Sequence, residues 1–456
     1  MSSNRRDFLT LSGALAAGGL LAGCLAPVQG DDTVTVDTVE SDESPVTPDD
    51  VGDDVLQRLV ADNTDFALDL HGSLAEADPN ANRFVSPYSV SVALAMTYAG
   101  ARGETRQQMG QTLRFSLSRE ELHPAFYALR RQVNGETDGD AESDGSNDSE
   151  SDDREPCPFT LAGANALWGQ EGYPWRDPYL ATLEANYGTG LHAVDFTSDA
   201  EAARQTINSW VADRTEDRIQ DLLPKGSVHD LTRLVLTNAI YFKANWQHEF
   251  DEGKTTPREF TALDGSTAEV PTMEVIEDFQ YATVDGHQLV ELPYVGGGVS
   301  MVVVLPRDGR FEQFEQRLDA ARLSTLLEAL DEREGTLRLP KFTFESATSL
   351  KQTLSDLGMP VAFDQTDADF SGMADPEAGK LFIGDVIHKS FVGVDEKGTE
   401  AAAATAVTME TTSAEVNPPK PFEMTVDRPF LFAIRHRRTD AVLFLGRVVD
   451  AAAAQE

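Results

Sequence analysis

Cysteine and positive charge are what this chain of 456 residues has least of. Only two cysteines occur, Cys24 and Cys157, so disulfides cannot be what holds a domain of this size together. Lysine and arginine total 37 against 77 aspartates and glutamates, which gives a formal charge of −40. Such a surface repels phosphate groups and argues against nucleic acids and anionic membrane surfaces as partners. An acidic, lysine-poor surface is typical of proteins that stay soluble in concentrated salt, so we expect a halophilic source.

The chain also lacks the sequence motifs of common enzymes. It has no G-x-S-x-G, H-E-x-x-H, Walker loop, S-x-x-K followed by K-T-G, or C-x-x-C, and its 8 histidines show no metal-ligand spacing. The three glycines from Gly296 are more typical of a hairpin connection than of a phosphate cradle, because no helix follows them. We expect no enzyme activity, metal or cofactor. An exported hydrolase stays the alternative, because catalytic triads assemble from residues far apart in sequence.

The first residues have the layout of a removable export signal. Arg5 and Arg6 precede an apolar run with many small residues, which ends in Leu21-Ala22-Gly23-Cys24. Residues 1–23 resemble a twin-arginine (Tat) signal peptide with a lipobox, and this resemblance implies that Cys24 carries lipid as the first residue of the mature chain. A plain signal peptide with an incidental cysteine is the alternative. We expect an extracellular or cell-surface protein that touches a membrane only through Cys24.

Two acidic stretches have no pattern that could pack. Residues 24–52 are rich in Asp, Thr, Val, Pro and Glu, and predict a disordered stalk. Residues 134–156 hold ten carboxylates against Arg154 alone, and predict a disordered insertion, with an ion-binding loop as the alternative. The remainder of 53–450, before a short tail at 451–456, mixes helical and strand periods without a repeat. One α+β domain with much antiparallel sheet is therefore expected.

Hydrophobic periodicity places the main elements. A spacing of 3.6 residues predicts helices at 55–74, 89–99, 123–132, 178–187, 200–223, 311–330 and 350–357. Alternating or continuous apolar runs predict strands at 159–168, 234–242, 288–292, 299–305, 336–339, 381–394, 422–426, 430–435 and 442–448.

The segment 396–420 has an unusual run of small residues. In a strand, Thr399, Ala401, Ala403 and Thr405 would face the same side, and every one of them is small. No bulky, charged or proline residue on that face would prevent the segment from entering a sheet between two existing strands. The alanines alone favour a helical turn. Gly398 before them and β-branched residues after them favour the extended segment instead.

Several motifs distributed along the domain resemble one known family. They are NRFVSPYSVSVALAM at 82–96, LTNAIYFKANW at 236–246, DEKGTEAAAA at 395–404, DRPFLF at 427–432 and LFLGRV at 443–448. In this order they resemble the serpins, inhibitors of serine proteases. The resemblance implies a serpin fold with three β-sheets, about eight to nine helices and an exposed reactive-centre loop. It also implies a monomer that traps its protease covalently after the loop is cut and inserted as a strand. A non-inhibitory serpin that acts as a carrier or structural protein is the alternative.

The same resemblance gives roles to individual residues. Those of the hinge are Glu396, Lys397, Gly398, Thr399, Glu400, Ala401, Ala402, Ala403 and Ala404. Those of the region where the main sheet opens are Ser86, Ser89, Asn238 and His388, with Trp246 at the loop entry. In the family the hinge glycine lies fourteen residues before the attacked residue, which selects the bond between Thr412 and Ser413, with Met409, Glu410 and Thr411 as alternatives. A small residue there fits a subtilisin-like or elastase-like protease.

Overall fold

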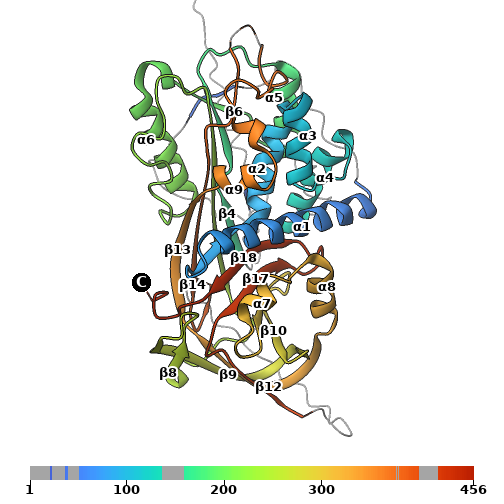
Figure 1. Ribbon diagram of the computed structural model, residues 1–456, viewed down its shortest axis with the longest axis vertical. Helices are drawn as coiled ribbons and strands as arrows, with labels where there is room; N and C mark the ends of the chain where they lie inside the picture. The colour runs from blue at the N-terminus through green and yellow to red at the C-terminus, as the bar shows by residue number, and fades with distance from the viewer. Residues whose placement is uncertain are drawn as a thin grey trace, which may run out of the picture.

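Two large β-networks form the centre of the molecule, and helices pack against them (Figure 1). This computed structural model describes residues 21–22, 36–39, 51–135, 159–375, 377, 379–399 and 420–455. The helices are α1 (Asp53–Ala77), α2 (Pro87–Gly100), α3 (Gly103–Thr112), α4 (Arg119–Val133), α5 (Asp177–Tyr187), α6 (Phe196–Arg214), α7 (Phe311–Glu315), α8 (Ala320–Glu328) and α9 (Lys351–Asp356), with 3-10 turns η2 (Glu252–Lys254) and η3 (Pro360–Phe363). No helix among these described residues is long and apolar enough to cross a membrane.

The first network runs in the order β13-β14-β15-β7-β5-β6-β2, with β4 also paired to β7 and β1 to β4. Its strands are β1 (Leu21–Ala22), β2 (Thr38–Val39), β4 (Phe159–Gly163), β5 (Ala166–Gln170), β6 (Leu191–Val194), β7 (Leu234–Asn245), β13 (Phe342–Ser349), β14 (Val386–Val394) and β15 (Gly398–Thr399). Strand β7 is central because its apolar run is buried on both faces, as expected for a strand covered on two sides. Helix α6 covers one face of this main sheet, and α2 lies on the other (Figure 1).

The second network contains the remaining strands in the order β16-β12-β9-β10-β11-β17-β18-β3, with β8 paired to β9. They are β3 (Arg83–Val85), β8 (Thr256–Thr261), β9 (Thr267–Val284), β10 (His287–Pro293), β11 (Val299–Leu305), β12 (Asp331–Pro340), β16 (Phe422–Thr425), β17 (Phe430–His436) and β18 (Val442–Val448). The long strand β9 joins two sheets, because its first part pairs with β8 and its last part with β10. With the main sheet this gives the expected α+β arrangement of three sheets.

Two strands hold the ends of the segment that was expected to be the reactive loop. Strand β15 ends at Thr399 in the main sheet, and β16 begins at Phe422 in the second network. The Phe422 ring stacks on Tyr281 at a centroid distance of 4.1 Å and lies over Gly335. A Cβ on Gly335 would lie 2.2 Å from that ring, so glycine is what lets Phe422 anchor β16.

Most predicted elements are present, with changes at their ends. The strands at 299–305 and 442–448 agree with β11 and β18. The predicted helix 311–330 is wrong as one element, because it breaks into α7 and α8, with Asp319 capping α8. The helix at 200–223 already ends at Arg214, and the strand predicted from 381 begins only at Val386. The three glycines from Gly296 do connect the hairpin of β10 and β11, two of them with positive φ.

Elements without a strong apolar period were missed. Helix α3 has a polar sequence, and β13 (FTFESATS) carries threonines and serines where an amphipathic strand would have larger apolar residues. Near the N-terminus, residues 36–39 of the predicted stalk contribute a strand to the main sheet, which its composition did not suggest. Strand β1 lies within the predicted signal segment and pairs with β4.

Candidate functional site: the hinge and the opening of the main sheet

The main sheet divides where the predicted hinge begins. Strands β7 and β14 pair directly in parallel from Leu236–Val386 to Tyr241–Phe391. Beyond that point β15 lies between them, with Thr399 opposite Ala244 on one side and Val394 on the other. Gly398 and Thr399 of the hinge already form a short strand between β7 and β14, and the residues that follow them could extend this strand.

Backbone contacts hold the hinge at this entry. Trp246 donates its backbone N–H to the Lys397 carbonyl at 2.8 Å, and Phe250 does the same to Glu396 at 2.8 Å. The Asp395 carboxylate accepts from the N–H groups of Lys397 (2.8 Å) and Gly398 (3.2 Å). A turn from Asp395 to Gly398 therefore feeds the chain into the sheet.

Gly398 is required by close approach of the backbone. A Cβ at this position would lie 2.0 Å from the Ala244 carbonyl oxygen and 2.8 Å from the Cα of Asn245. Backbone atoms cannot move aside as the end of a flexible side chain can. The glycine that the sequence places at the start of the hinge is therefore the residue that lets the chain approach β7.

Thr399 is the first residue of the loop whose side chain faces the core. It is fully buried, and its hydroxyl lies 2.7 Å from the Tyr294 hydroxyl. The Tyr294 ring stacks on Trp246 at 4.5 Å, and the Trp246 indole N–H donates to the Asp395 carbonyl at 2.9 Å. Burial raises the pKa of Tyr294 far above its usual value, so this hydroxyl stays neutral. The predicted role of Trp246 at the loop entry fits this position, whereas the contribution of Tyr294 was missed.

The Glu396 carboxylate fixes the other side of the hinge turn. It accepts from the Lys341 ammonium at 2.7 Å and from the Thr255 hydroxyl at 2.7 Å. Burial alone would raise the pKa of Glu396, but these two hydrogen bonds hold it below its usual value. Lys341 stands between β12 and β13, so the pair ties the hinge to the adjacent strand.

Glu396→Lys should loosen the hinge, because it sets two ammonium groups against each other and leaves Thr255 without its acceptor. We expect the melting temperature to fall by about 1 °C or more, for a loss of about 1 kcal/mol or more. Amide exchange at Trp246 and Phe250 should also rise. Calorimetry and hydrogen exchange would measure the two effects. Glu396→Gln is the matched control, since it keeps an acceptor, and its melting temperature should lie between those of wild type and Glu396→Lys. If Glu396→Lys changes neither measurement, the Glu396–Lys341 pair does not hold the hinge.

Further along the main sheet, the predicted opening residues form one buried network. Ser89 donates its hydroxyl to Oδ1 of Asn165 at 2.9 Å, and the Asn238 amide donates to the Ser89 hydroxyl at 3.0 Å and to Asn165 Oδ1 at 2.9 Å. The Ser86 hydroxyl donates to the Leu443 carbonyl at 2.6 Å. The four predicted residues are 0 % exposed, so the structure does bring them together.

His388 connects this network to the neighbouring strand. Its Nε2 accepts from the Ser86 backbone N–H at 3.1 Å, so this nitrogen carries no proton. Its Nδ1 is then the protonated nitrogen, and donates to Asn238 Oδ1. Burial lowers the pKa of His388 to about 3, so the ring is neutral at ordinary pH. A neutral ring of this tautomer joins β14 to β7 and α2 at the place where the strands must part.

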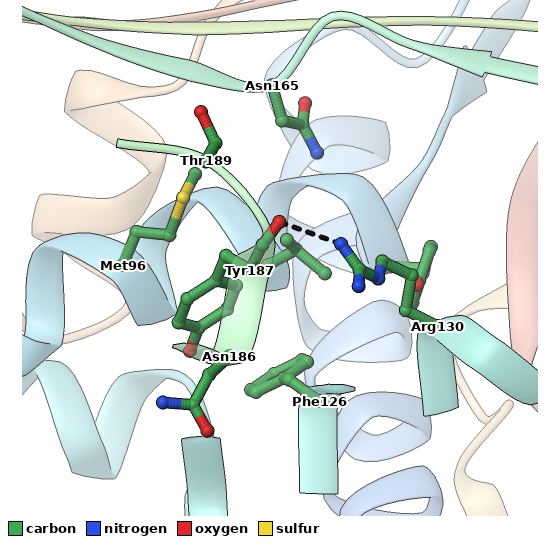
Figure 2. A pocket seen from close by; sticks show the side chains of 9 residues that line it. Met96, Phe126, Arg130, Asn165, Asn186, Tyr187 and Thr189 are labelled. Carbon is green, nitrogen blue, oxygen red and sulfur yellow. Dashed lines mark hydrogen bonds between the residues drawn. The ribbon is translucent and has the colours of Figure 1, made fainter. Parts of the chain in front are cut away.

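Asn165 was not predicted as part of the network. It lies in the short break between β4 and β5, and its amide donates to the Ser89 carbonyl at 3.2 Å. Asn165 also lines a small pocket of about 10 Å³, together with Arg130 and Tyr187 (Figure 2). That volume is about the size of one water molecule. A single asparagine between two alanines gives no periodic signal, so only the fold reveals it.

The other predicted residues lie outside the described part of the chain. They are Cys24, Glu400, Ala401, Ala402, Ala403, Ala404, Met409, Glu410, Thr411, Thr412 and Ser413. Among the described residues, no group of His, Cys, Asp and Glu could hold a metal ion.

Comparison with known proteins shows the family of this chain. The family model described as "Serpin (serine protease inhibitor)" matches residues 61–451. A serpin-like protein of Thermococcus kodakarensis is 39% identical over 84% of both chains. The human leukocyte elastase inhibitor is 38% identical over 86% of this chain and 99% of its own.

Solved structures give the same result. Uncleaved ovalbumin superposes with a TM-score of 0.72 and 29% identity, over 86% of this chain and 99% of its own. The thermophilic serpin tengpin in its native state superposes with a TM-score of 0.75 and 26% identity, over 91% of this chain and 100% of its own. The chain belongs to the serpin family, a family of serine protease inhibitors rather than of catalysts.

Proposed function

We propose that this serpin inhibits serine proteases as a suicide substrate. The observation that carries the proposal is the position of Gly398 and Thr399. They pair with β7, and Thr399 also pairs with β14, at the end of the sheet where these two strands separate. The segment that follows them in sequence is the one with small residues on alternate positions. A cut in the segment would free it to continue this strand.

The pairing of β15 with β7 and its pairing with β14 predict the same position for each inserted residue. Thr399 is opposite Ala244 of β7 and Val394 of β14, and His388 is opposite Asn238 across the closed sheet. Continued antiparallel, the strand brings Thr405 opposite both Asn238 and His388. Thr405 has the same orientation as Thr399, so its hydroxyl would face the buried network. A small hydroxyl can then replace the hydrogen bond that is lost when β7 and β14 separate.

The chemistry requires no general base from this chain. The protease serine attacks the carbonyl of the scissile residue, which we place at Thr412, and the peptide bond to Ser413 breaks. The protease becomes an ester of Thr412, and Ser413 leaves with a new amino terminus. Insertion of 400–412 carries the acylated protease along the sheet and stalls hydrolysis of the ester. The free energy comes from added strand pairing in a fold held by kinetic stability.

The expected target is a subtilisin-like or elastase-like protease. The sequence has no lysine or arginine between Lys397 and Lys420, which argues against trypsin-like enzymes. The relative named leukocyte elastase inhibitor supports the elastase-like choice. We further propose that the protein acts as a monomer at the cell surface, after Tat export and lipid attachment at Cys24. Cys24→Ser should then release it into the medium.

Incubation of the purified protein with subtilisin and with elastase tests the inhibitor proposal. We expect a covalent complex that survives denaturing electrophoresis, and a released C-terminal peptide whose mass identifies the cut bond. A peptide that begins at Ser413 would confirm the register. Cleavage within 400–419 by both enzymes without a complex would contradict inhibition and favour a non-inhibitory serpin.

A further inference from the structure

A short piece of the N-terminal region covers the outer edge of the main sheet. Strand β2 pairs antiparallel with β6, with Thr38 opposite His192 and Val39 opposite Leu191. The backbone N–H of Ala193 donates to the Asp37 carbonyl at 2.8 Å. Without this segment the outer side of β6 would be an unpaired strand edge, which is a template for strands of other chains.

The two valines of this segment contact apolar clusters on opposite faces of the main sheet. Val36 packs on the cluster between the sheet and α6, which includes Trp168 and Trp210. Val39 packs on the main core cluster, which lies behind the same sheet. Asp37 between them is exposed. In an extended chain, residues three positions apart face opposite sides, so each valine is matched to an apolar surface on its own side.

Gly190, just before β6, leaves room for the segment because it has no side chain. A Cβ on Gly190 would lie 2.6 Å from Thr38 Cγ2 and 2.9 Å from the Val39 carbonyl oxygen. Its backbone is not in the left-handed region, so the only demand for glycine here is the room that β2 takes. The edge of β6 therefore has a backbone donor, two apolar contacts and a gap that fits an extended chain.

We propose that the outer edge of β6 is a binding site for an extended peptide, and that residues 36–39 of the same chain occupy it. A suitable peptide has β-branched apolar residues three positions apart, as Val36 and Val39 are. Docking caps the edge against other strands and fixes the point where the N-terminal region leaves the domain. His192 aligns through Trp168 with Val235 at the start of β7, whereas the hinge pairs with Ala244. This separation of nine positions along β7 places the exit about 30 Å from the hinge along the strand.

The test uses full-length protein and hydrogen exchange at the Ala193 amide. Val36→Asp places a carboxylate against the apolar cluster below α6 and should release the segment, so exchange at Ala193 should rise about tenfold or more. Gly190→Ala should give a similar rise by taking the space of Thr38. Because both changes release the same pairing of β2 with β6, the double variant should exchange at Ala193 little faster than either single variant. Asp37→Asn alters only an exposed side chain, and should leave exchange unchanged.

A synthetic peptide of residues 33–40 supplies the second measurement. It should restore Ala193 protection in Val36→Asp but not in Gly190→Ala, and should reverse any oligomer that Val36→Asp forms in size-exclusion chromatography. If Gly190→Ala does not fold, the Val36→Asp protein with and without peptide decides alone. Unchanged protection in Val36→Asp, or no restoration by the peptide, would overturn the proposal. Neither result depends on protease inhibition.

Discussion

Under the proposed mechanism, Thr399→Arg should convert the protein from an inhibitor into an ordinary substrate. The Thr399 side chain is fully buried, and its hydroxyl pairs with Tyr294, which stacks on Trp246. An arginine in this place would have to bury an uncompensated charge, at a cost of about 3–5 kcal/mol. The charge would keep the hinge out of its place between β7 and β14, so the proposed insertion would first have to bury it, and a cost of that size would slow insertion about a hundredfold or more. Hydrolysis of the acyl-enzyme would then finish before the protease is displaced.

The stoichiometry of inhibition measures this effect. With wild-type protein most cleavage events should end in a covalent complex, and with Thr399→Arg nearly all should end in cleaved, free serpin. Thr399→Ser keeps the hydroxyl and Thr399→Val keeps the shape, so both controls should still form complex. A Thr399→Arg protein that traps protease as well as wild type would show that the loop does not enter the sheet at β15.

Much of the hinge could be predicted because its constraints are local in sequence. Gly398 and the small residues after it are neighbours along one strand, and a strand that enters a sheet imposes a period of two. The partners that hold the hinge could not be found in this way. Tyr294 follows β10 and Lys341 lies between β12 and β13, and only the pairing of the sheets brings them to Thr399 and Glu396.

The same limit applies to the opening network and to the sheet edge. Ser86, Ser89, Asn238 and His388 were identified through the family resemblance, whereas Asn165 lies at a break within a predicted strand and carries no pattern. In the N-terminal region, acidic composition predicted a stalk throughout. Four residues with two valines are too few to change such a composition, but are enough to complete a strand edge.

In the proposed insertion, the inserted segment would share the register of the opening network, and this would link stability to mechanism. His388 and Asn238 are opposite each other in the closed sheet, and the position that Thr405 would take lies between them. The hydrogen bond between the two side chains would therefore have to break for the proposed insertion. Its strength would then set part of the barrier to insertion, and a change in the charge of His388 should alter that barrier.

Acid should weaken the closed sheet through His388. The pKa of this ring is about 3 in the fold because of burial, against about 6.5 in an unfolded chain. Its contribution to stability is therefore complete above pH 6.5 and is lost as the pH falls from 6.5 toward 3, where the unfolded chain takes up a proton that the folded one does not. The linkage amounts to about 3 kcal/mol between pH 6.5 and 4.

Other buried histidines also add to acid sensitivity, since burial lowers the pKa of His123 to about 3 and of His192 and His436 to about 4. The contribution of His388 is therefore measured as a difference. His388→Gln can still accept from Ser86 and donate to Asn238, but does not titrate. Urea unfolding at pH 7.5 and pH 4.5 should show a smaller loss of unfolding free energy in His388→Gln than in wild type, by about 2–3 kcal/mol. Equal losses in both proteins would mean that the neutral imidazole does not hold β14 to β7.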